Sequence, residues 1–276
     1  LLALQETLYS DSTTSNIGKW VTINSGRTPD KKSGVSFFVA PKLKASIKNY
    51  QTVSDRIITL TLFTTGGLCT LVNHHAPTDT TDNPLATKEA HWDLLHQTLR
   101  AIPRVNTIII LGDSNFKWEG RHPDECDIAG PYMFGRGIEY LESRTHDNRD
   151  LGVEFLRSHS LYFLNSYFKK APHFKATYRK PATPMNAPVT PHTHLEIDHI
   201  YGNEAAKKAC TDVTTRPHIY NKELHHILEA HFHLPYQKRP QPPKEPKPDR
   251  KQLLKIRVKN EVIDILSENI LDRPFS

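Results

Sequence analysis

The sequence has no long apolar run: none exceeds four residues, the length of Ile108 to Leu111. A membrane-spanning helix needs about 20 consecutive, mostly apolar residues. The first residues, Leu1 to Leu4, also lack the basic segment that begins a secretory signal peptide. We therefore expect no membrane partner.

Cysteine is scarce as well. The three cysteines, Cys69, Cys126 and Cys210, are odd in number and lie far apart in the chain. Secreted disulfide frameworks use even numbers of closely spaced cysteines, so this pattern favours a reduced, intracellular protein.

The net charge of +6 is unevenly distributed. Residues 238–250 contain five prolines, five basic residues and two acidic residues, a composition typical of a semi-rigid linker. Residues 251–276 place apolar side chains at helical spacing and predict an amphipathic helical tail, which would pack on its own body or on a copy of itself, or be the remainder of a domain that once continued. The body, residues 1–237, is nearly balanced, so charge alone does not indicate a nucleic-acid partner.

Strand-like segments of the body are rich in β-branched and aromatic residues and are bounded by Gly, Pro, Asn or Asp. They cover residues 34–40, 56–64, 68–74, 106–111, 161–165 and 195–201. Apolar spacing predicts helices at residues 87–102 and 147–158. Because strands outnumber helices and several follow one another directly, the pattern favours an α/β fold with antiparallel-rich sheets covered by helices.

The strongest local motif is Gly112-Asp113-Ser114-Asn115, directly after an apolar strand. Side chains two residues apart at a strand end point to the same side, so Asp113 and Asn115 would converge. The carboxylate can accept a proton from water or bind a metal, and the amide can orient a phosphate oxygen. The same residues also fit an Asx turn that closes a buried strand.

A second motif, Ile197-Asp198-His199-Ile200, interrupts an apolar strand with a carboxylate. Such a carboxylate must be paired, metal-bound or solvated. It can orient a histidine from elsewhere in the chain, or it can be an ordinary aspartate at a strand edge.

Histidines gather near the end of the body, at His225-His226 and at His231-Phe232-His233. His231 and His233 would share one strand face, as would His192 and His194, so a zinc site is one interpretation. At the other end of the chain, Glu6 follows an apolar segment, where it can bind Mg²⁺ or simply lie exposed.

Taken in order, these motifs resemble those of the endonuclease/exonuclease/phosphatase superfamily. The matching segments are Leu4-Gln5-Glu6-Thr7, Ala76-Pro77-Thr78, Gly112-Asp113-Ser114-Asn115, Ile197-Asp198-His199-Ile200 and His231-Phe232. The stretches between them are similar to the retrotransposon branch, the endonucleases of LINE-type elements. The resemblance covers residues 1–235 and implies a two-sheet α/β sandwich with helices outside and an active site at one rim.

The resemblance also implies residue roles. Glu6 would bind a catalytic Mg²⁺, for which Mn²⁺ can substitute. Asp113 would activate the attacking water, and Asn115 would hydrogen-bond the scissile phosphate. Asp198 would orient His231, which would stabilise the charge that develops on the phosphate.

Further implications concern one more catalytic residue, partners and position in the cell. His75 stands where the family pattern has a tyrosine before Ala-Pro, so it is a further candidate catalytic residue. DNA is the implied partner, the nucleus is the implied compartment, and no small-molecule cofactor is expected.

Two departures from the family pattern bear on activity. The family's first strand should precede Leu4-Gln5-Glu6, so we expect an N-terminally shortened domain with an unpaired sheet edge beside residues 1–7. Directly before the terminal histidine, His231, the family pattern has an aspartate, but this chain has Ala230. Two interpretations therefore stay open, an Mg²⁺-dependent DNA endonuclease and an inactive remnant of the same fold, with phosphatases of small phosphoesters as a third.

Overall fold

Three central strands bury side chains on both faces, and the fold is built around them. They are β6 (Ile57–Thr64), β7 (Gly67–His75) and β8 (Thr107–Asp113). Ile108 and Ile110 pack into one hydrophobic core and Ile109 into another, because successive side chains of a strand point to opposite faces. Burial on both faces explains why these strands read as nearly continuous apolar runs in the sequence.

The structure is a computed structural model that describes residues 1–28, 33–80, 83–143, 147–217 and 224–240. Residues 1–239 belong to one structural unit. The linker from residue 241 onward and the helical tail at 251–276 lie outside the described residues, so both stay predictions.

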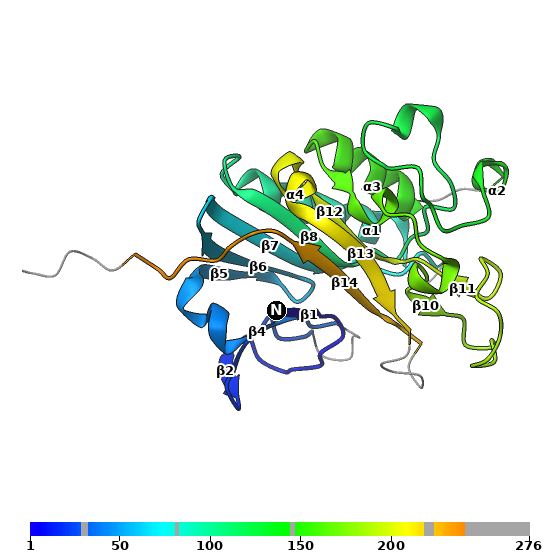
Figure 1. The fold of residues 1–276 in the computed structure, drawn as a ribbon. Coiled ribbons are helices and arrows are strands. Elements are labelled where there is room, and N and C mark those ends of the chain that lie inside the picture. The colour runs from blue at the N-terminus through cyan, green and yellow to red at the C-terminus, as the bar shows by residue number, and fades with distance from the viewer. Residues whose placement is uncertain (29–32, 81–82, 144–146, 218–223, 241–276) are drawn as a thin grey trace, which may run out of the picture. The chain divides into compact units, whose positions relative to one another are not determined.

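A six-stranded sheet contains the central strands in the order β5-β6-β7-β8-β12-β9. Its other members are β5 (Ile47–Ser54), β12 (Asp198–Gly202) and β9 (Tyr162–Phe163). β7 and β8 pair in parallel, and the remaining neighbours pair antiparallel. Helices α1 (Leu85–Arg100) and α3 (Asp147–Ser158) cover one face through Trp92, Leu95 and Phe155 (Figure 1).

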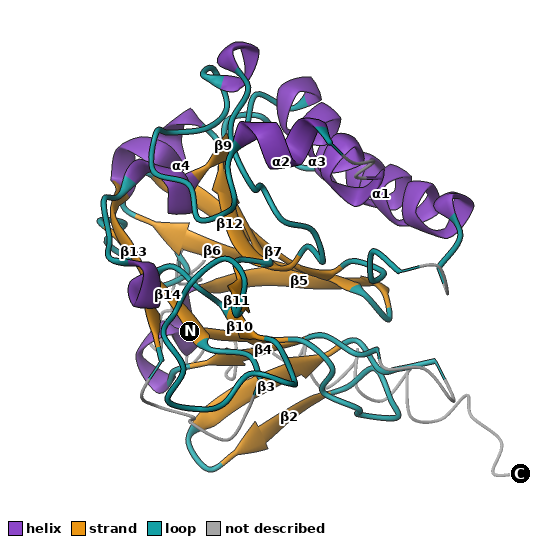
Figure 2. Cartoon of the chain, turned by 90° about the vertical axis from the view of Figure 1, so that its right-hand side faces the viewer, coloured by secondary structure: helices purple, strands orange, loops and turns teal. Residues whose placement is uncertain are grey.

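A four-stranded sheet, in the order β1-β4-β3-β2, covers the other face. It is made of β1 (Leu2–Leu4), β4 (Ser36–Val39), β3 (Trp20–Asn24) and β2 (Thr14–Ile17). Phe37 and Ile23 pack with Ile58 and Leu60 in the core between the two sheets. Figure 2 shows the resulting layers, with helices on one side of the larger sheet and the smaller sheet on the other.

Smaller elements complete the unit. They are the strand pairs β10 (Tyr178–Arg179) with β11 (His194–Leu195) and β13 (Cys210–Arg216) with β14 (Ile227–Phe232), and the short helices α2 (Ile138–Glu142) and α4 (Glu204–Ala209). The layers confirm the predicted two-sheet α/β sandwich. In the described part of the chain, no helix is both long and apolar enough to cross a membrane.

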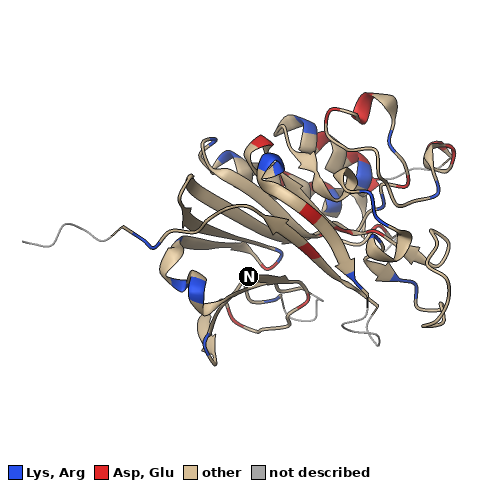
Figure 3. Ribbon diagram, viewed as in Figure 1, with Lys and Arg blue, Asp and Glu red and all other residues tan. Residues whose placement is uncertain are grey.

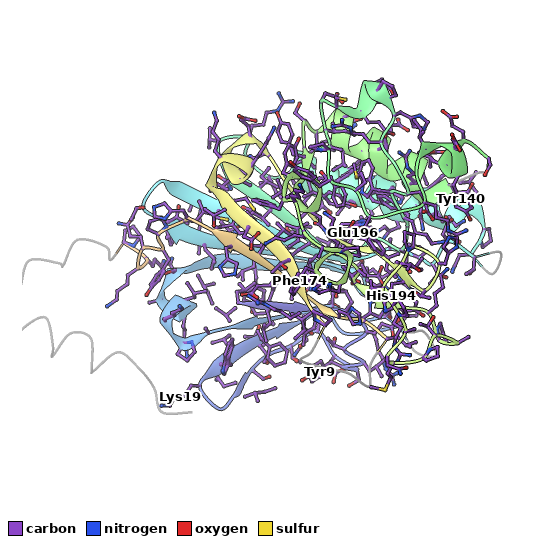
Figure 4. All side chains as sticks on the ribbon, turned by 45° about the vertical axis from the view of Figure 1, so that its right-hand side comes forward. Tyr9, Lys19, Tyr140, Phe174, His194 and Glu196 are labelled. Carbon is purple, nitrogen blue, oxygen red and sulfur yellow. The ribbon has the colours of Figure 1, made fainter. Side chains whose placement is uncertain are left out.

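One predicted strand, 195–201, is interrupted in the structure. Its first residues pair with β10, and its later residues pair with β8. Between them Ile197 accepts a hydrogen bond from the backbone N–H of Ser114, 3.0 Å away, and the side chain of Glu196 is buried in the interior (Figure 4). The chain therefore changes sheets within the segment that the sequence analysis took as one strand.

The list of predicted strands did not include β2, β3, β5, β10, β13 or β14. β5 is an edge strand with four consecutive exposed residues, so it lacks the alternating pattern from which strands are predicted. The unpaired edge expected near the N-terminus is present: β1 pairs with β4 and has no second strand partner among the described residues.

Gly112 allows β7 and β8 to approach closely at their ends. Its φ is +148°, and a Cβ there would lie 1.9 Å from the carbonyl oxygen of His74. We predict that Gly112→Ala lowers the free energy of unfolding by about 2–3 kcal/mol or more, since both the backbone angle and the neighbouring strand oppose it.

Gly66→Ala is the matched control, because a Cβ at Gly66 meets open space. Urea unfolding of the two variants and the wild type measures the difference. Equal stability of Gly112→Ala and Gly66→Ala would contradict the close approach.

Candidate active site

Three neighbouring strand ends bring ionisable side chains into one row. His75 ends β7 and lies opposite Asp113 in the parallel register. Asp198 begins β12 and lies opposite Asp113 in the antiparallel register. The main-chain pairing of the sheet therefore fixes the spacing of these three side chains.

A histidine from a later segment completes the group. His225 Nδ1 lies 3.1 Å from Asp198 Oδ2, within hydrogen-bond distance, and its Nε2 lies 4.0 Å from Asp113 Oδ2. Its backbone forms an isolated bridge with Tyr178, and the ring of Tyr178 packs edge-on against the imidazole, with the ring centroids 4.8 Å apart. Asp113, Asp198 and His225 each offer a ligand atom, and these atoms lie within 4.8 Å of one another.

The Gly-Asp-Ser-Asn turn has both features that the sequence suggested. The backbone N–H of Asn115 donates to Asp113 Oδ1 at 2.8 Å, which is an Asx-type bond. The Asn115 side chain donates to the carbonyl of Ala76 at 2.8 Å, and Asn115 adopts a left-handed φ of 52°. Asparagine tolerates this conformation better than most residues, so the turn presents Asp113 and Asn115 at one place.

Glu6 reaches the same site from the four-stranded sheet. Its carboxylate lies 3.9 Å from His75 Nε2, and about half of its side chain is exposed. Glu6 also has a left-handed φ, 51°, a conformation that costs a non-glycine residue roughly 1–2 kcal/mol. A strained, half-exposed carboxylate beside a buried imidazole is typical of a functional position.

The electrostatics of the site are strongly coupled. Burial, followed by the charge of Asp198, raises the pKa of Asp113 well above its ordinary value. Burial opposes protonation of His225, but the charge and hydrogen bond of Asp198, with help from Asp113, raise the pKa of His225 to about 9. Burial, with the nearby charge of Arg56, lowers the pKa of His75 to about 3. At neutral pH the site therefore holds a protonated His225 and a neutral His75.

The position of His231 corrects one prediction. His231 lies on β14 opposite Asp212, and its Nε2 is 2.9 Å from Glu229 Oε1. Asp198 hydrogen-bonds His225 instead. The reason is the path of the chain. His225, which precedes β14, bridges to Tyr178 of β10 beside the site, whereas β14, which carries His231, pairs with β13.

For the same reason, the alanine at position 230 does not mark a carboxylate missing from this site. It lies on β14 and packs against the core between the sheets. The residue before the site histidine is Leu224. The His225-His226 pair was visible in the sequence, but nothing in a linear motif tells which histidine the fold brings to Asp198.

The histidine pairs considered for zinc are not brought together. His194 is buried and packs against the ring of His226, while His231 is held by Glu229. Within the described ranges, Asp113, Asp198 and His225 are the one group of three or more candidate ligands within reach of a single ion. Oxygen-rich sets of this kind suit Mg²⁺ or Mn²⁺ better than zinc.

Comparison with known families agrees with this geometry. A family model described as "Endonuclease/Exonuclease/phosphatase family" matches residues 1–237. The chain therefore belongs to the endonuclease/exonuclease/phosphatase family. No curated protein matches the chain.

Solved structures with a similar fold include several nucleic-acid enzymes. The AP endonuclease of Leishmania major has a TM-score of 0.59 at 12% identity, covering 84% of this chain and 78% of that one. The endonuclease domain of TRAS1, a telomere-specific non-LTR retrotransposon, has a TM-score of 0.51 at 13% identity, covering 79% and 80%. The 3′ phosphatase NExo from Neisseria, bound to product DNA hairpin, has a TM-score of 0.53 at 17% identity, covering 78% and 79%. At these identities the likeness shows the fold alone.

The raised pKa of Asp113 predicts that this residue destabilises the metal-free protein. The pKa of an aspartate in the unfolded chain is about 3.9. At pH values between this and the raised pKa in the folded chain, Asp113 holds a proton in the folded chain that it has lost in the unfolded chain. The free energy of unfolding therefore falls as the pH rises through this range. Asp113→Asn removes this dependence. We predict that it raises the free energy of unfolding at pH 8, in EDTA, by about 1 kcal/mol or more.

Asp127→Asn, at an exposed position, serves as the control for loss of one negative charge. Thermal and urea unfolding at pH 5 and pH 8 measure both variants. A loss of stability in Asp113→Asn at pH 8 would contradict the description of the site as electrostatically strained.

Proposed function

We propose that this chain is a phosphodiester hydrolase that cleaves DNA with the help of a divalent metal ion, Mg²⁺ or Mn²⁺. The observation that carries the proposal is the Asp113–His225–Asp198 group at the ends of β8 and β12. It combines a proton acceptor with a cationic hydrogen-bond donor, 4.0 Å apart. Hydrolysis of a phosphodiester needs both.

Asp113 is suited to accept a proton from water. A general base works best when its pKa lies near the working pH, and burial beside Asp198 moves the pKa of Asp113 in that direction. Its Oδ1 is already held by the N–H of Asn115, so Oδ2, which faces His225, is the oxygen available to the water.

His225 is suited to stabilise negative charge on a phosphate. Asp198 accepts from its Nδ1, which fixes the ring and leaves Nε2–H to donate to a substrate oxygen. Because the pKa of His225 is raised to about 9, the ring carries its positive charge at neutral pH. The amide of Asn115 lies in the same turn as Asp113 and can orient the substrate.

The residues of this site also fit a divalent metal. Glu6 presents a half-exposed carboxylate near His75, and it is close enough to raise the pKa of both Asp113 and His225. Asp113 and Asp198 offer hard oxygen ligands within 4.8 Å of each other, and Glu6, which lies beside His75 next to Asp113, would supply a further carboxylate once an ion is bound. When bound, the metal neutralises phosphate charge and activates water.

A local basic cluster supports a polyanionic substrate. Burial and then the charges of Arg136 and Lys117 lower the pKa of Lys180, while the charge of Glu119 opposes that shift, so three cations and one carboxylate act on one another here. Lys117 follows Asn115 by two residues, and Lys180 follows Tyr178, which packs on His225. Other lysines and arginines are spread over many elements (Figure 3), so this cluster is a better argument for DNA than the net charge.

The sequence resemblance of the stretches between the motifs supports an origin in a LINE-type retrotransposon. In that setting a nick would provide a 3′-hydroxyl for reverse transcription, and the protein would act in the nucleus. The remnant interpretation becomes the alternative outcome of the activity test.

We predict that the purified protein nicks supercoiled plasmid with Mg²⁺ or Mn²⁺ and that EDTA stops the reaction. Asp113→Ala and His225→Ala should each lower the rate by about 10²- to 10⁴-fold, since one removes the base and the other the cation at the phosphate. Agarose-gel assays of relaxed and supercoiled DNA give the rates.

His231→Ala is the matched control, since it removes an imidazole that pairs with Glu229 away from this group. It should leave the rate unchanged. A large loss in His231→Ala with full activity in His225→Ala would refute the assignment. Absence of nicking by folded wild-type protein would decide for the inactive remnant.

A further inference from the structure

Three strands carry a residue of the site. In each of them, the residue next to the site residue along the chain is also polar and is buried. The pairs are His75 with His74 on β7, Asp113 with Ser114 at the end of β8, and Asp198 with His199 on β12. Because neighbouring side chains of a strand point to opposite faces, the second set lies behind the site. His74, Ser114 and His199 are all fully buried.

These residues form a continuous hydrogen-bonded chain. Ser114 Oγ lies 3.3 Å from His74 Nε2 and 3.0 Å from the Tyr201 hydroxyl. The Tyr201 hydroxyl lies 2.8 Å from His199 Nδ1. At one end of the chain, His74 Nδ1 lies 3.4 Å from His91 Nε2.

The other end of the chain fixes the direction of every bond. His199 Nε2 lies 3.2 Å from the carbonyl oxygen of Glu196, which can only accept, so Nε2 carries the proton. A neutral His199 then accepts at Nδ1 from the Tyr201 hydroxyl, and that hydroxyl, its one proton used, accepts from Ser114.

The same proton count continues through β7. Ser114 has one proton and gives it to Tyr201, so it accepts from His74 Nε2–H, and His74 Nδ1 accepts from His91 Nε2–H. One proton arrangement therefore satisfies all five bonds, and it requires neutral histidines. Burial favours that state, since it lowers the pKa of His74 to about 4 and that of His199 to about 3.

Aromatic rings enclose this chain. The ring centroid of Trp92 lies 5.9 Å from that of His74 and 6.0 Å from that of His91. Phe116 and Phe163 lie 4.8 and 5.0 Å from His199, centroid to centroid. A dry environment strengthens hydrogen bonds and raises the cost of breaking one.

We propose that the His91–His74–Ser114–Tyr201–His199 chain is a positioning device that holds the ends of β7, β8 and β12 at the spacing the active site requires. Ser114 is its central member, because it lies between Asp113 and Asn115 and bonds to residues of both neighbouring strands. Its catalytic consequence rests on the proposed function, whereas its effect on the geometry of the site does not.

Two variants remove one hydroxyl each without adding volume, Ser114→Ala and Tyr201→Phe. We expect kcat for plasmid nicking to fall by about 10- to 100-fold in each, with KM for the DNA unchanged, as is typical for residues that orient others. The double variant should lose little more than either single one, since one break already interrupts the chain.

Thr70→Val is the matched control. Thr70 lies on β7, four residues before His74. Its buried hydroxyl accepts a hydrogen bond from the side chain of Asn106. This variant should lose comparable stability by urea unfolding and keep its kcat. Equal losses of kcat in Thr70→Val and Ser114→Ala would overturn the proposal in favour of a general packing role.

Two further measurements do not depend on catalysis. In ¹⁵N-histidine-labelled protein at pH 7, two-bond ¹⁵N–¹H spectra should place the proton of His74 and of His199 on Nε2, and a proton on Nδ1 of either would overturn the chain. Mn²⁺ affinity, measured by EPR, should weaken about 10-fold in Ser114→Ala and not in Thr70→Val. If wild-type protein does not nick DNA, the proposed function fails, and these two measurements still decide the inference: unchanged Mn²⁺ affinity in Ser114→Ala would refute it.

Discussion

The pairing of β8 with β7 on one side and with β12 on the other is the constraint on which the rest of the structure depends. Parallel register sets His75 beside Asp113, and antiparallel register sets Asp198 beside Asp113. A shift of one residue in either register would turn these side chains to the opposite face. Two hydrophobic cores, one on each face of the same strands, resist such a shift, because it would move Ile109 into the core that Ile108 and Ile110 fill and those two residues into the other core.

The same arrangement concentrates unfavourable electrostatics at one place. Asp113 is buried beside Asp198, and His75 is buried beside the charge of Arg56. Burial and the charge of Asp198 disfavour the ionised form of Asp113, and burial with the charge of Arg56 disfavours the protonated form of His75. Clusters of this kind gather at functional sites, and the proposed divalent cation with a phosphate would relieve the charge that ionised Asp113 and Asp198 share.

Much of the fold was predictable because it follows from local pattern. The apolar residues of 56–64, 68–74 and 106–111 identify the central strands, and the Gly-Asp-Ser-Asn and Ile-Asp motifs at their ends identify Asp113, Asn115 and Asp198. The first motif directly follows a predicted strand, whereas the start of β12 at Asp198 and its position opposite Asp113 emerge only from the structure. Edge strands such as β5 carry polar residues on exposed faces and give no such signal.

The rest depends on contacts between distant segments. Whether His225 or His231 meets Asp198 is decided by the path of the chain past Tyr178, which no spacing rule encodes. The contacts of Ser114 were equally hidden, because nothing in the motif indicates that His74 and Tyr201 lie on either side of its hydroxyl.

The central claim is that Glu6, Asp113, Asp198 and His225 form one metal-dependent reaction centre. The most direct measurement is the anomalous diffraction of crystals soaked in Mn²⁺, which locates the ion without reference to activity. The account predicts one manganese peak bound by Glu6 in the space shared with Asp113, with His225 still hydrogen-bonded to Asp198. A peak elsewhere in the molecule, or full occupancy of this position in a Glu6→Gln, Asp113→Asn double variant, would contradict it.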